Sequence, residues 1–501
     1  MRYDFQHKKF IDCDTDVEKL AVSGSDADIT WAELKIKTEK FADLLKKLQI
    51  PTGHPVIIYG HKEHLFPVAI LACLHSNIPY IPIDKIYPID RIKKISAASG
   101  SQAIINCTNG SLAIQTPITI NANFEPAINS KPDFTDNTYG NANDPIQYIM
   151  FTSGSTGEPK GVQITQAGIN TFIDWITTSF KLKKTDVFMN QAPFTFDISL
   201  FDTFGAFAMG GTLILNTHEQ VKDHDLFLKR IKEYKCTFWN STPSFVYIYL
   251  RDPAFNNRDL SSIHTFLFMG EELPNRTVSV LKKNFNNIRV LNAYGPTEAT
   301  VITTAIEITD EVLKQYPVLP IGYAMPASTL LIEKNTPENK EGELIIVGDH
   351  VSTGYLKNEE LNSNKFFLHN GKRAFKTGDL AYYENDLLFF VGRNDEQIKL
   401  HGYRIELSEI NNVLTENSIV LDAITIPLKR NNEVKKIVSF IKLKHGTDPT
   451  NSKETLLLFL GNKLPYYMIP GDISFIESFP YNVSHKIDKK KLVEDYINNQ
   501  A

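Results

Sequence analysis

The sequence is poor in cysteine and has no long apolar run. Only four of its 501 residues are cysteines, they are scattered along the chain, and no two form a CxxC pair. This pattern argues against both a disulfide framework and a cysteine-based metal site. No apolar stretch approaches the length of a membrane span, and the N-terminal segment Met-Arg-Tyr-Asp-Phe-Gln-His-Lys-Lys lacks the apolar core of a signal peptide. We therefore expect a cytoplasmic protein without stable membrane insertion.

A strong excess of either charge is also missing. The formal net charge is -5, which gives no reason to expect a nucleic-acid partner. Hydrophobic residues make up 42% of the chain and charged residues 22%, as is typical of soluble globular proteins. A chain of 501 residues is too long for one ordinary core, so two or three domains or subdomains are expected.

Strand-like and helix-like segments alternate in the first part of the chain. Apolar runs predict strands at 55–59 and 103–106, and the run 79–84 predicts a strand followed by a turn. Helical patterns occupy 29–48, where Thr30 is a candidate N-cap, 65–74 and 89–95. Such alternation predicts a parallel sheet with helices on its faces.

The rest of the chain continues this α/β pattern after an interruption. The polar residues 109–145 predict a loop-dominated connection, and the alternation then resumes to about 330 as a second sheet half. Two further strand-like runs, 343–347 and 387–391, indicate a smaller β unit. We predict an α/β fold with a large N-terminal domain, residues 1–394, made of two α/β sheet subdomains plus the β unit, and a small α+β C-terminal domain, residues 395–501.

One histidine-containing segment has two interpretations, a metal site or a solvent-exposed helix start. His61-Lys62-Glu63-His64 offers two histidines, but no third ligand is evident in the sequence. We therefore expect the start of a solvated helix there.

The most informative stretch is 150–161, Met-Phe-Thr-Ser-Gly-Ser-Thr-Gly-Glu-Pro-Lys-Gly, between a strand-like run and a helical pattern that begins near Gln166. Its small residues let the backbone turn tightly, so that consecutive N–H groups and three hydroxyls can face polyphosphate oxygens. Lys160 adds a cation. The spacing is not that of a Walker A loop. A solvated linker is the alternative, but a linker would not normally follow a buried strand directly and end in Pro-Lys-Gly.

This stretch resembles the phosphate loop of the AMP-forming adenylation superfamily, which covers acyl-CoA synthetases, luciferases and peptide-synthetase adenylation domains. Further segments resemble that superfamily in the same order and extend the likeness over nearly the whole chain. They are Tyr294-Gly295-Pro296-Thr297-Glu298, Thr377-Gly378-Asp379, Phe390-x-Gly392-Arg393-x-Asp395, the run 397–405 and the segment around Lys486. The resemblance implies that ATP and Mg²⁺ are required.

The resemblance also implies roles for individual residues. Glu298 and Thr156 would hold Mg²⁺, which usually accepts one carboxylate plus substrate phosphates, and together with Lys486 they would be the catalytic residues. Asp395 would be the hinge about which a mobile C-terminal domain turns. His485 stands where the superfamily usually has glycine before this lysine. The implied ATP-binding residues are Thr152, Ser153, Gly154, Ser155, Thr156, Lys160, Asn292, Ala293, Tyr294, Gly295, Pro296, Thr297, Asp379, Phe390, Gly392, Arg393 and Lys486.

Asp197 indicates the type of carboxylic acid. It lies in the apolar and aromatic run Phe194-Thr195-Phe196-Asp197-Ile198, where a carboxylate is costly to bury unless it meets a cation. A substrate ammonium group would supply that cation, and in amino-acid-activating members of the superfamily this aspartate binds the α-amino group. The alternative is that Asp197 caps a helix that starts at Ile198. We expect an amino acid rather than a fatty acid.

The flanking segments are similar to the ligases that charge a carrier protein with D-alanine for teichoic acid alanylation. These segments are 190–197, 239–245, 294–301 and 397–404. The likeness implies a substrate site made by Asp197, Ile198, Met269, Gly270, Gly295, Val301 and Lys486. Met269 stands where these ligases typically have cysteine, and with Phe201 it should keep the pocket small.

The expected reaction is ATP-dependent formation of D-alanyl-AMP and transfer of the D-alanyl group to the phosphopantetheine thiol of a separate carrier protein. Chirality depends on where one methyl group fits, which is worth only about 1–3 kcal/mol of discrimination. A stand-alone adenylation enzyme for glycine, L-alanine or serine in a natural-product pathway therefore stays open. An acyl-CoA synthetase is disfavoured by Asp197, and a non-catalytic nucleotide-binding module by the presence of both Glu298 and Lys486.

Overall fold

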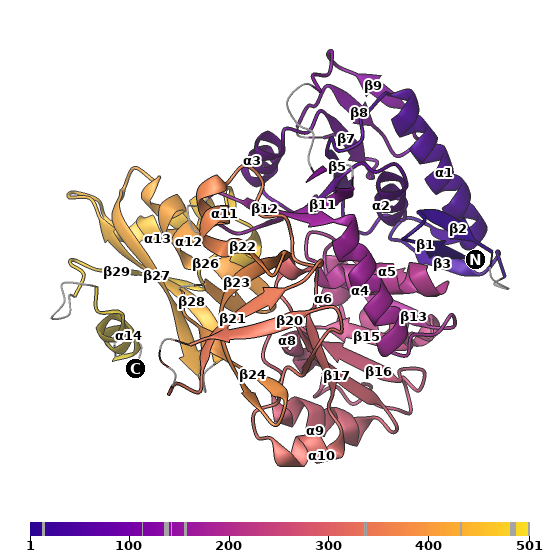
Figure 1. Cartoon of the computed structure of the whole chain (residues 1–501). Coiled ribbons are helices and arrows are strands. Elements are labelled where there is room, and N and C mark those ends of the chain that lie inside the picture. Colours follow the sequence, from indigo (N-terminus) through magenta and orange to yellow (C-terminus); the bar gives the residue numbers. More distant parts are fainter. Residues whose placement is uncertain are drawn as a thin grey trace. The chain divides into compact units, whose positions relative to one another are not determined.

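The computed structural model in Figure 1 describes residues 1–12, 16–112, 114–134, 140–141, 143–154, 158–334, 336, 338–395, 397–430, 433–480 and 487–498. The chain separates into two compact units. The larger unit comprises Met1–Lys85, Ser99–Phe151 and Gly161–Asn394. The smaller unit comprises Ile86–Ala98, Thr152–Lys160 and Asp395–Ala501.

The first sheet of the larger unit has eight strands in the order β10-β11-β6-β5-β7-β8-β9, with β12 paired to β11. The strands are β5 (Val56–Gly60), β6 (Tyr80–Asp84), β7 (Ala103–Asn106), β8 (Ile118–Ile120), β9 (Pro126–Ile128), β10 (Gly140–Asn141), β11 (Asp144–Thr152) and β12 (Lys160–Thr165). The central strands β11, β6, β5, β7 and β8 run parallel, which buries both faces of the sheet and accounts for their nearly continuous apolar sequences.

The second sheet has nine strands in the order β19-β18-β17-β16-β15-β13-β14-β3-β4. They are β3 (Leu20–Ser23), β4 (Asp28–Thr30), β13 (Val187–Asn190), β14 (Thr212–Leu215), β15 (Phe238–Ser241), β16 (Thr265–Phe268), β17 (Arg289–Tyr294), β18 (Thr304–Glu307) and β19 (Tyr323–Ala324). Strands β3, β14, β13, β15, β16 and β17 are parallel. Their carboxyl ends therefore lie along one edge, where open α/β sheets bind ligands.

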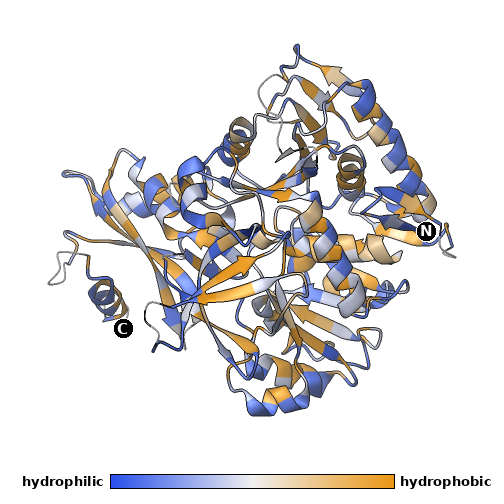
Figure 2. Ribbon diagram, in the orientation of Figure 1, coloured by the Kyte–Doolittle hydropathy of each residue, from blue (hydrophilic) through white to orange (hydrophobic). Residues whose placement is uncertain are grey.

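Helices connect these strands, and their sequences explain where they start and how deeply they are buried. Thr30 caps α1 (Trp31–Lys47) in a capping box with Glu33, and Figure 2 shows that hydrophilic and hydrophobic residues are mixed along this helix. In α2 (Leu65–His75) every residue before His75 is buried. The other α-helices of this unit are α4 (Gln166–Ser179), α5 (Ile198–Met209), α6 (His218–Lys222), α7 (His224–Glu233), α8 (Pro243–Tyr249), α9 (Asn275–Asn284), α10 (Asp310–Gln315) and α11 (Glu359–Lys365).

Two smaller sheets complete the larger unit. The hairpin of β1 (Arg2–Asp4) and β2 (Lys9–Ile11) packs through β1 against α5. The other is an antiparallel sheet in the order β20-β21-β23-β22, with β24 paired to β23. Its strands are β20 (Thr329–Glu333), β21 (Gly342–Val347), β22 (Phe366–His369), β23 (Lys372–Glu384) and β24 (Leu387–Arg393).

The smaller unit has its own core. Its three-stranded sheet, β27-β28-β29, and the hairpin β25-β26 bury an apolar cluster with the helices that follow them. The elements are α3 (Ile89–Ser99), β25 (Gln397–Leu400), β26 (Tyr403–Glu406), α12 (Leu407–Thr415), β27 (Val420–Arg430), β28 (Glu433–Leu443), α13 (Pro449–Gly461), β29 (Asp472–Phe475) and α14 (Lys489–Asn498).

The predicted α/β class is confirmed, but the prediction of a loop-dominated connection over 109–145 is incomplete. That segment contributes β8, β9 and β10, and β11 already begins at Asp144. These strands are two or three residues long, too short for a periodic pattern to reveal them.

The prediction that residues 61–64 begin a solvated helix is wrong. His61, Lys62 and Glu63 are 3%, 0% and 6% exposed, and α2 starts only at Leu65. Burial lowers the pKa of Lys62 to about 7, although Asp84, Asp202 and Glu63 oppose this shift. The segment follows the central strand β5, so its polar side chains point into protein rather than into water.

The expectations drawn from scarce cysteines and missing apolar runs can be compared with the described part of the chain. There, Cys73, Cys107 and Cys236 are unbonded and buried. No cluster of three His, Cys, Asp or Glu side chains suited to a metal ion occurs among the residues that the structure describes. Within those residues no helix combines the length and the apolar character that crossing a membrane requires.

Candidate active site

Two of the predicted nucleotide-binding residues donate hydrogen bonds to a third, whose carboxylate is buried. Asp379 on β23 lies directly opposite Arg393 on β24, and the Arg393 guanidinium donates to Asp379 Oδ1 at 2.5 Å. The hydroxyl of Tyr294, at the end of β17, donates to Asp379 Oδ2. Burial and the Asp379 carboxylate raise the pKa of Tyr294, which keeps this hydroxyl a donor. The Phe390 ring lies 6.3 Å from that of Tyr294.

The chain leaves β17 through a turn that needs glycine. A Cβ atom on Gly295 would lie 2.5 Å from Ile302 Cα, so no larger residue fits there. Asn292 donates to the Pro320 carbonyl at 2.8 Å and anchors the strand before the turn. Ala293 is buried in β17, and Pro296 precedes the 3₁₀ turn Thr297–Ala299.

Glu298 is fully buried within this turn. The Tyr355 hydroxyl donates to Glu298 Oε1 at 2.7 Å, and the Ser352 N–H donates to the Glu298 carbonyl at 2.8 Å. Both contacts come from the segment between β21 and α11. They hold the carboxylate in one orientation, and nothing in the sequence indicated them.

The backbone after Glu298 is strained. Thr300 and Val301 have φ values of 55° and 71°, in the left-handed region, where a β-branched residue is a rare outlier. The Thr300 hydroxyl donates to the His350 carbonyl at 2.7 Å. Strain of this kind persists only where the surroundings over-determine the conformation, and it clusters at functional sites.

The residues predicted to bind the amino acid, apart from Lys486, lie at the start of α5 and in the segments that follow β16 and β17. Asp197 stands at the N-cap position of α5, but its side chain makes no capping hydrogen bond, so the capping alternative does not describe it. Met269, Val301 and Phe201 are buried in one hydrophobic core, and Ile198 packs against that core. Gly270 follows β16 with a φ of 90°.

The described part of the phosphate loop contacts residues of the C-terminal segment within the smaller unit. The Ser153 hydroxyl donates to the Arg404 carbonyl at 2.9 Å, and the Gly154 N–H donates to Glu409 Oε2 at 3.1 Å. Lys160 Nζ donates to Glu406 Oε1 at 3.1 Å. Thr152 ends β11.

Glu409 is itself buried and paired. It accepts from the Arg91 guanidinium at 2.7 Å, and burial raises its pKa while Arg91 lowers it. The loop amide and the loop lysine thus face carboxylates here, the same type of charge that a phosphate would present. Asp395 accepts from the Gln397 N–H at 3.2 Å.

For several predicted site residues the structure gives no contact that bears on their role. Ser155, Thr156, His485 and Lys486 lie outside the described residues. Gly392, opposite Leu380 in the β23–β24 pair, and Thr297 lie on described backbone, and their roles toward ATP stay predictions.

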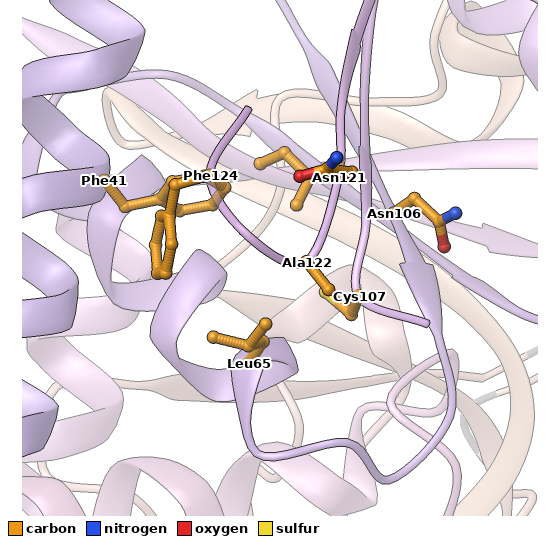
Figure 3. Close-up of a pocket in the computed structure, with 8 residues that line it drawn as sticks. Phe41, Leu65, Asn106, Cys107, Asn121, Ala122 and Phe124 are labelled. Carbon is orange, nitrogen blue, oxygen red and sulfur yellow. The ribbon is translucent and has the colours of Figure 1, made fainter. Parts of the chain in front are cut away.

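A small pocket in the first sheet does not belong to the predicted site. Figure 3 shows Phe41, Leu65, Cys107 and Phe124 among its lining residues. None of the residues that line it is among those predicted to bind ATP or an amino acid.

Comparison with known proteins finds one matching enzyme family and similar proteins that share one name. The model of the AMP-binding enzyme family matches residues 11–356. A D-alanine–D-alanyl carrier protein ligase of Bacillus licheniformis is 37% identical over 490 residues, which cover 96% of this chain and 97% of the relative. A ligase of the same name from Bacillus cereus is 36% identical over 479 residues, covering 94% of this chain and 95% of the relative.

Solved structures show the same fold. The Vibrio cholerae adenylation domain AlmE, in complex with glycyl-adenosine-5'-phosphate, has a TM-score of 0.82 at 22% identity and covers 98% of this chain and 99% of its own. IdnL1 has a TM-score of 0.79 at 24% identity, with 92% and 96% covered. Given the match over more than half of its length and relatives above 30% identity from end to end, the chain belongs to the AMP-binding enzyme family that includes the D-alanine–D-alanyl carrier protein ligases.

Proposed function

We propose that this protein activates D-alanine with ATP and transfers the D-alanyl group to the phosphopantetheine thiol of a separate carrier protein. The observation that carries the proposal is the 37% identity to a D-alanine–D-alanyl carrier protein ligase over 97% of that relative. Asp197 agrees with it, because a partly buried carboxylate that does not cap α5 suits a substrate ammonium group.

In the first step a carboxylate oxygen of D-alanine attacks the α-phosphorus of ATP, and the bond to pyrophosphate breaks. Asp197 holds the ammonium group so that the carboxylate faces the phosphorus. The turn after β17 supports the nucleotide through Tyr294 and Thr297, with Asp379 toward the ribose. Lys486 offsets the negative charge that develops, which is where electrostatic catalysis acts.

Glu298 and Thr156 would hold Mg²⁺. Glu298 fits this ion because it is a fully buried carboxylate in one fixed orientation, and a hard cation accepts such an oxygen together with substrate phosphates. When bound, Mg²⁺ would neutralise charge on the phosphate oxygens.

In the second step the carrier's thiolate attacks the acyl carbon of D-alanyl-AMP, a thioester forms, and AMP leaves. We propose that the C-terminal domain turns about Asp395 between the two steps, a conformational change of a common type. Lys160 and Gly154 donate to Glu406 and Glu409, so these two pairs would have to separate before the loop groups could donate to phosphate.

ATP–pyrophosphate exchange tests the proposal, with D-alanine, L-alanine, glycine, D-serine and a short fatty acid as substrates. The expected result is a strong preference for D-alanine. A preference for glycine or an L-amino acid would overturn the D-alanine assignment and point to Met269 and Phe201 as the residues that shape the pocket. Exchange with the fatty acid alone would contradict the role of Asp197.

A further inference from the structure

A fully buried lysine lies beside the segment that leads to Asp197. Lys62 is 0% exposed, and its Nζ donates to Asn190 Oδ1 and to the Ala192 carbonyl at 2.5 Å. The same Nζ lies 4.6 Å from the centre of the Phe194 ring. Two carbonyl oxygens and an aromatic face are all electron-rich, so this surrounding suits an ammonium group.

Asn190 connects Lys62 to the first turns of α5 through hydrogen bonds. Its Nδ2 donates to the Ser199 carbonyl at 3.1 Å and to Asp202 Oδ2 at 3.3 Å. Because the amide oxygen faces Lys62, the amide nitrogen must face α5. Asn240 adds a second bond to the same turn, from its Nδ2 to the Ile198 carbonyl at 3.0 Å. The residues on both sides of Asp197 are thus tied to a network that begins at Lys62.

The backbone that carries Lys62 is also fixed. The Ser25 N–H donates to the Lys62 carbonyl at 2.8 Å. Next to it, His61 Nε2 accepts from the His218 N–H at 3.1 Å, which leaves the ring proton on Nδ1, 2.7 Å from Asp84 Oδ2. These contacts fix the backbone that carries Lys62, whose ammonium group reaches Asn190 at the end of β13 and Ala192 in the turn after that strand.

Lys62 does not form an ordinary ion pair within the described part of the chain. Among the described residues no carboxylate lies within salt-bridge distance of its Nζ. A charge buried without a direct counter-ion is costly, and groups with strongly perturbed ionisation concentrate at functional sites. The hydrogen bonds to the turn are the interactions that offset this cost.

We propose that Lys62 is a positioning residue for the amino-acid site, holding the turn from Asn190 to Phe194 and, through it, the start of α5 from which Asp197 meets the substrate ammonium. This inference rests on the proposed function. Removing the ammonium group leaves the Ala192 carbonyl and Asn190 Oδ1 without their donor, so the turn relaxes and Asp197 moves. The affinity for the amino acid should fall while the nucleotide site stays intact.

The test is Lys62→Met in the full chain, because methionine keeps an unbranched stem and removes the nitrogen that donates to Asn190 and Ala192. In ATP–pyrophosphate exchange we expect the KM for D-alanine to rise about tenfold or more, with the KM for ATP changed by less than about twofold. The matched control is Lys85→Met, which removes the nearby ion pair with Glu63 at 2.8 Å, while no hydrogen bond or ion pair joins Lys85 to the described residues 190–199. It should leave both KM values unchanged.

A second variant keeps the test decisive if Lys62→Met fails to fold, as judged by thermal melting and by ATP binding in calorimetry. Asn190→Ala breaks the same network from its other side and should produce the same selective rise in KM. When both single variants fold, the double variant should be no worse than the more severe one, because both remove one shared interaction.

Selective changes in KM distinguish positioning from general stability, because partial unfolding lowers the amount of active enzyme without changing KM. A folded Lys62→Met protein with wild-type KM for D-alanine would overturn the inference. If the wild type shows no D-alanine-dependent exchange, the proposed function fails instead, and the KM comparison is made with the amino acid that the wild type does activate.

Discussion

Two turns at the carboxyl edge of the second sheet carry the carboxylates of the site, and they are held in different ways. The turn after β13 leads to Asp197 and is fixed by buried polar side chains, chiefly Lys62 and Asn190. The turn after β17 carries Glu298 and is fixed by a strained backbone that neighbouring loops support.

This difference indicates how sensitive the position of each carboxylate is to a single substitution. Asp197 is partly exposed, and Lys62 and Asn190 bind the turn before it and the first turn of the helix after it, so a single polar change there should alter its position. Glu298 is fully buried and supported through its side chain, its carbonyl and the Thr300 hydroxyl. Redundant support of this kind lets a strained conformation persist. Four substitutions test this contrast.

The largest effect is expected from Asp197→Ala. Without the carboxylate the substrate ammonium would be left without its partner, and kcat/KM for the amino acid should fall by about 10³-fold or more. ATP binding, measured by calorimetry, should stay close to that of the wild type. Unchanged turnover would refute the amino-group role of Asp197.

Glu298→Gln should lower the rate of adenylate formation rather than the affinity for the amino acid. Glutamine keeps the size of the side chain and a possible bond with Tyr355 but removes the charge, so kcat for adenylate formation should fall by about 10²–10³-fold. Single-turnover measurement of the acyl-adenylate at saturating Mg²⁺ checks this. The KM for D-alanine should change little, in contrast to Asp197→Ala, and a wild-type rate would remove Glu298 from the catalytic residues.

Tyr355→Phe should have a moderate effect because it removes only the hydroxyl that orients Glu298. The loss of one hydrogen bond to a buried carboxylate costs about 1–3 kcal/mol, so kcat should fall about tenfold and more Mg²⁺ should be needed for half-maximal rate. Tyr249→Phe is the control, since the Tyr249 hydroxyl also donates inside the protein, to the Val221 carbonyl at 3.2 Å. Equal effects of the two substitutions would argue against a specific role for Tyr355.

The smallest effect is expected from His350, whose carbonyl accepts the hydrogen bond from Thr300, and it concerns how stability depends on pH. Burial lowers the pKa of His350 to about 3, with Arg373 and Lys372 contributing in the same direction. The ordinary histidine pKa is 6.5, so between about pH 6.5 and pH 3 the unfolded chain binds a proton that the folded protein does not. In that window His350 makes the free energy of unfolding fall as the pH is lowered, by at most about 1.4 kcal/mol per pH unit.

Urea unfolding of the wild type and of His350→Gln at pH 7 and at pH 5 measures this contribution. The variant should lose less stability between the two values than the wild type, because glutamine cannot bind a proton. Identical losses would mean that His350 is protonated at its usual pH in the folded protein.

Contiguous patterns predicted much of the fold, and the residues that they assign to the site remain a prediction. The N-cap at Thr30, the apolar helix from Leu65 and the helix at Gln166 each depend on neighbouring residues, and each formed as expected. The polar segment after β5 was wrongly assigned to the surface, because a local pattern cannot report what packs above it. Histidine and lysine are exposed in most proteins, and only their burial distinguishes these copies.

The sequence by itself determined the α/β class, the order of the longer strands along the chain and the motifs that imply an adenylating enzyme, since all of these depend on residues close together in the chain. Only the tertiary structure decided which distant residues support them. Lys62 and Asn190 are 128 positions apart, and Glu298 and Tyr355 are 57 apart. Contacts of this kind arise from the order of strands within the sheets, where non-consecutive segments become neighbours, and no local periodicity encodes that order.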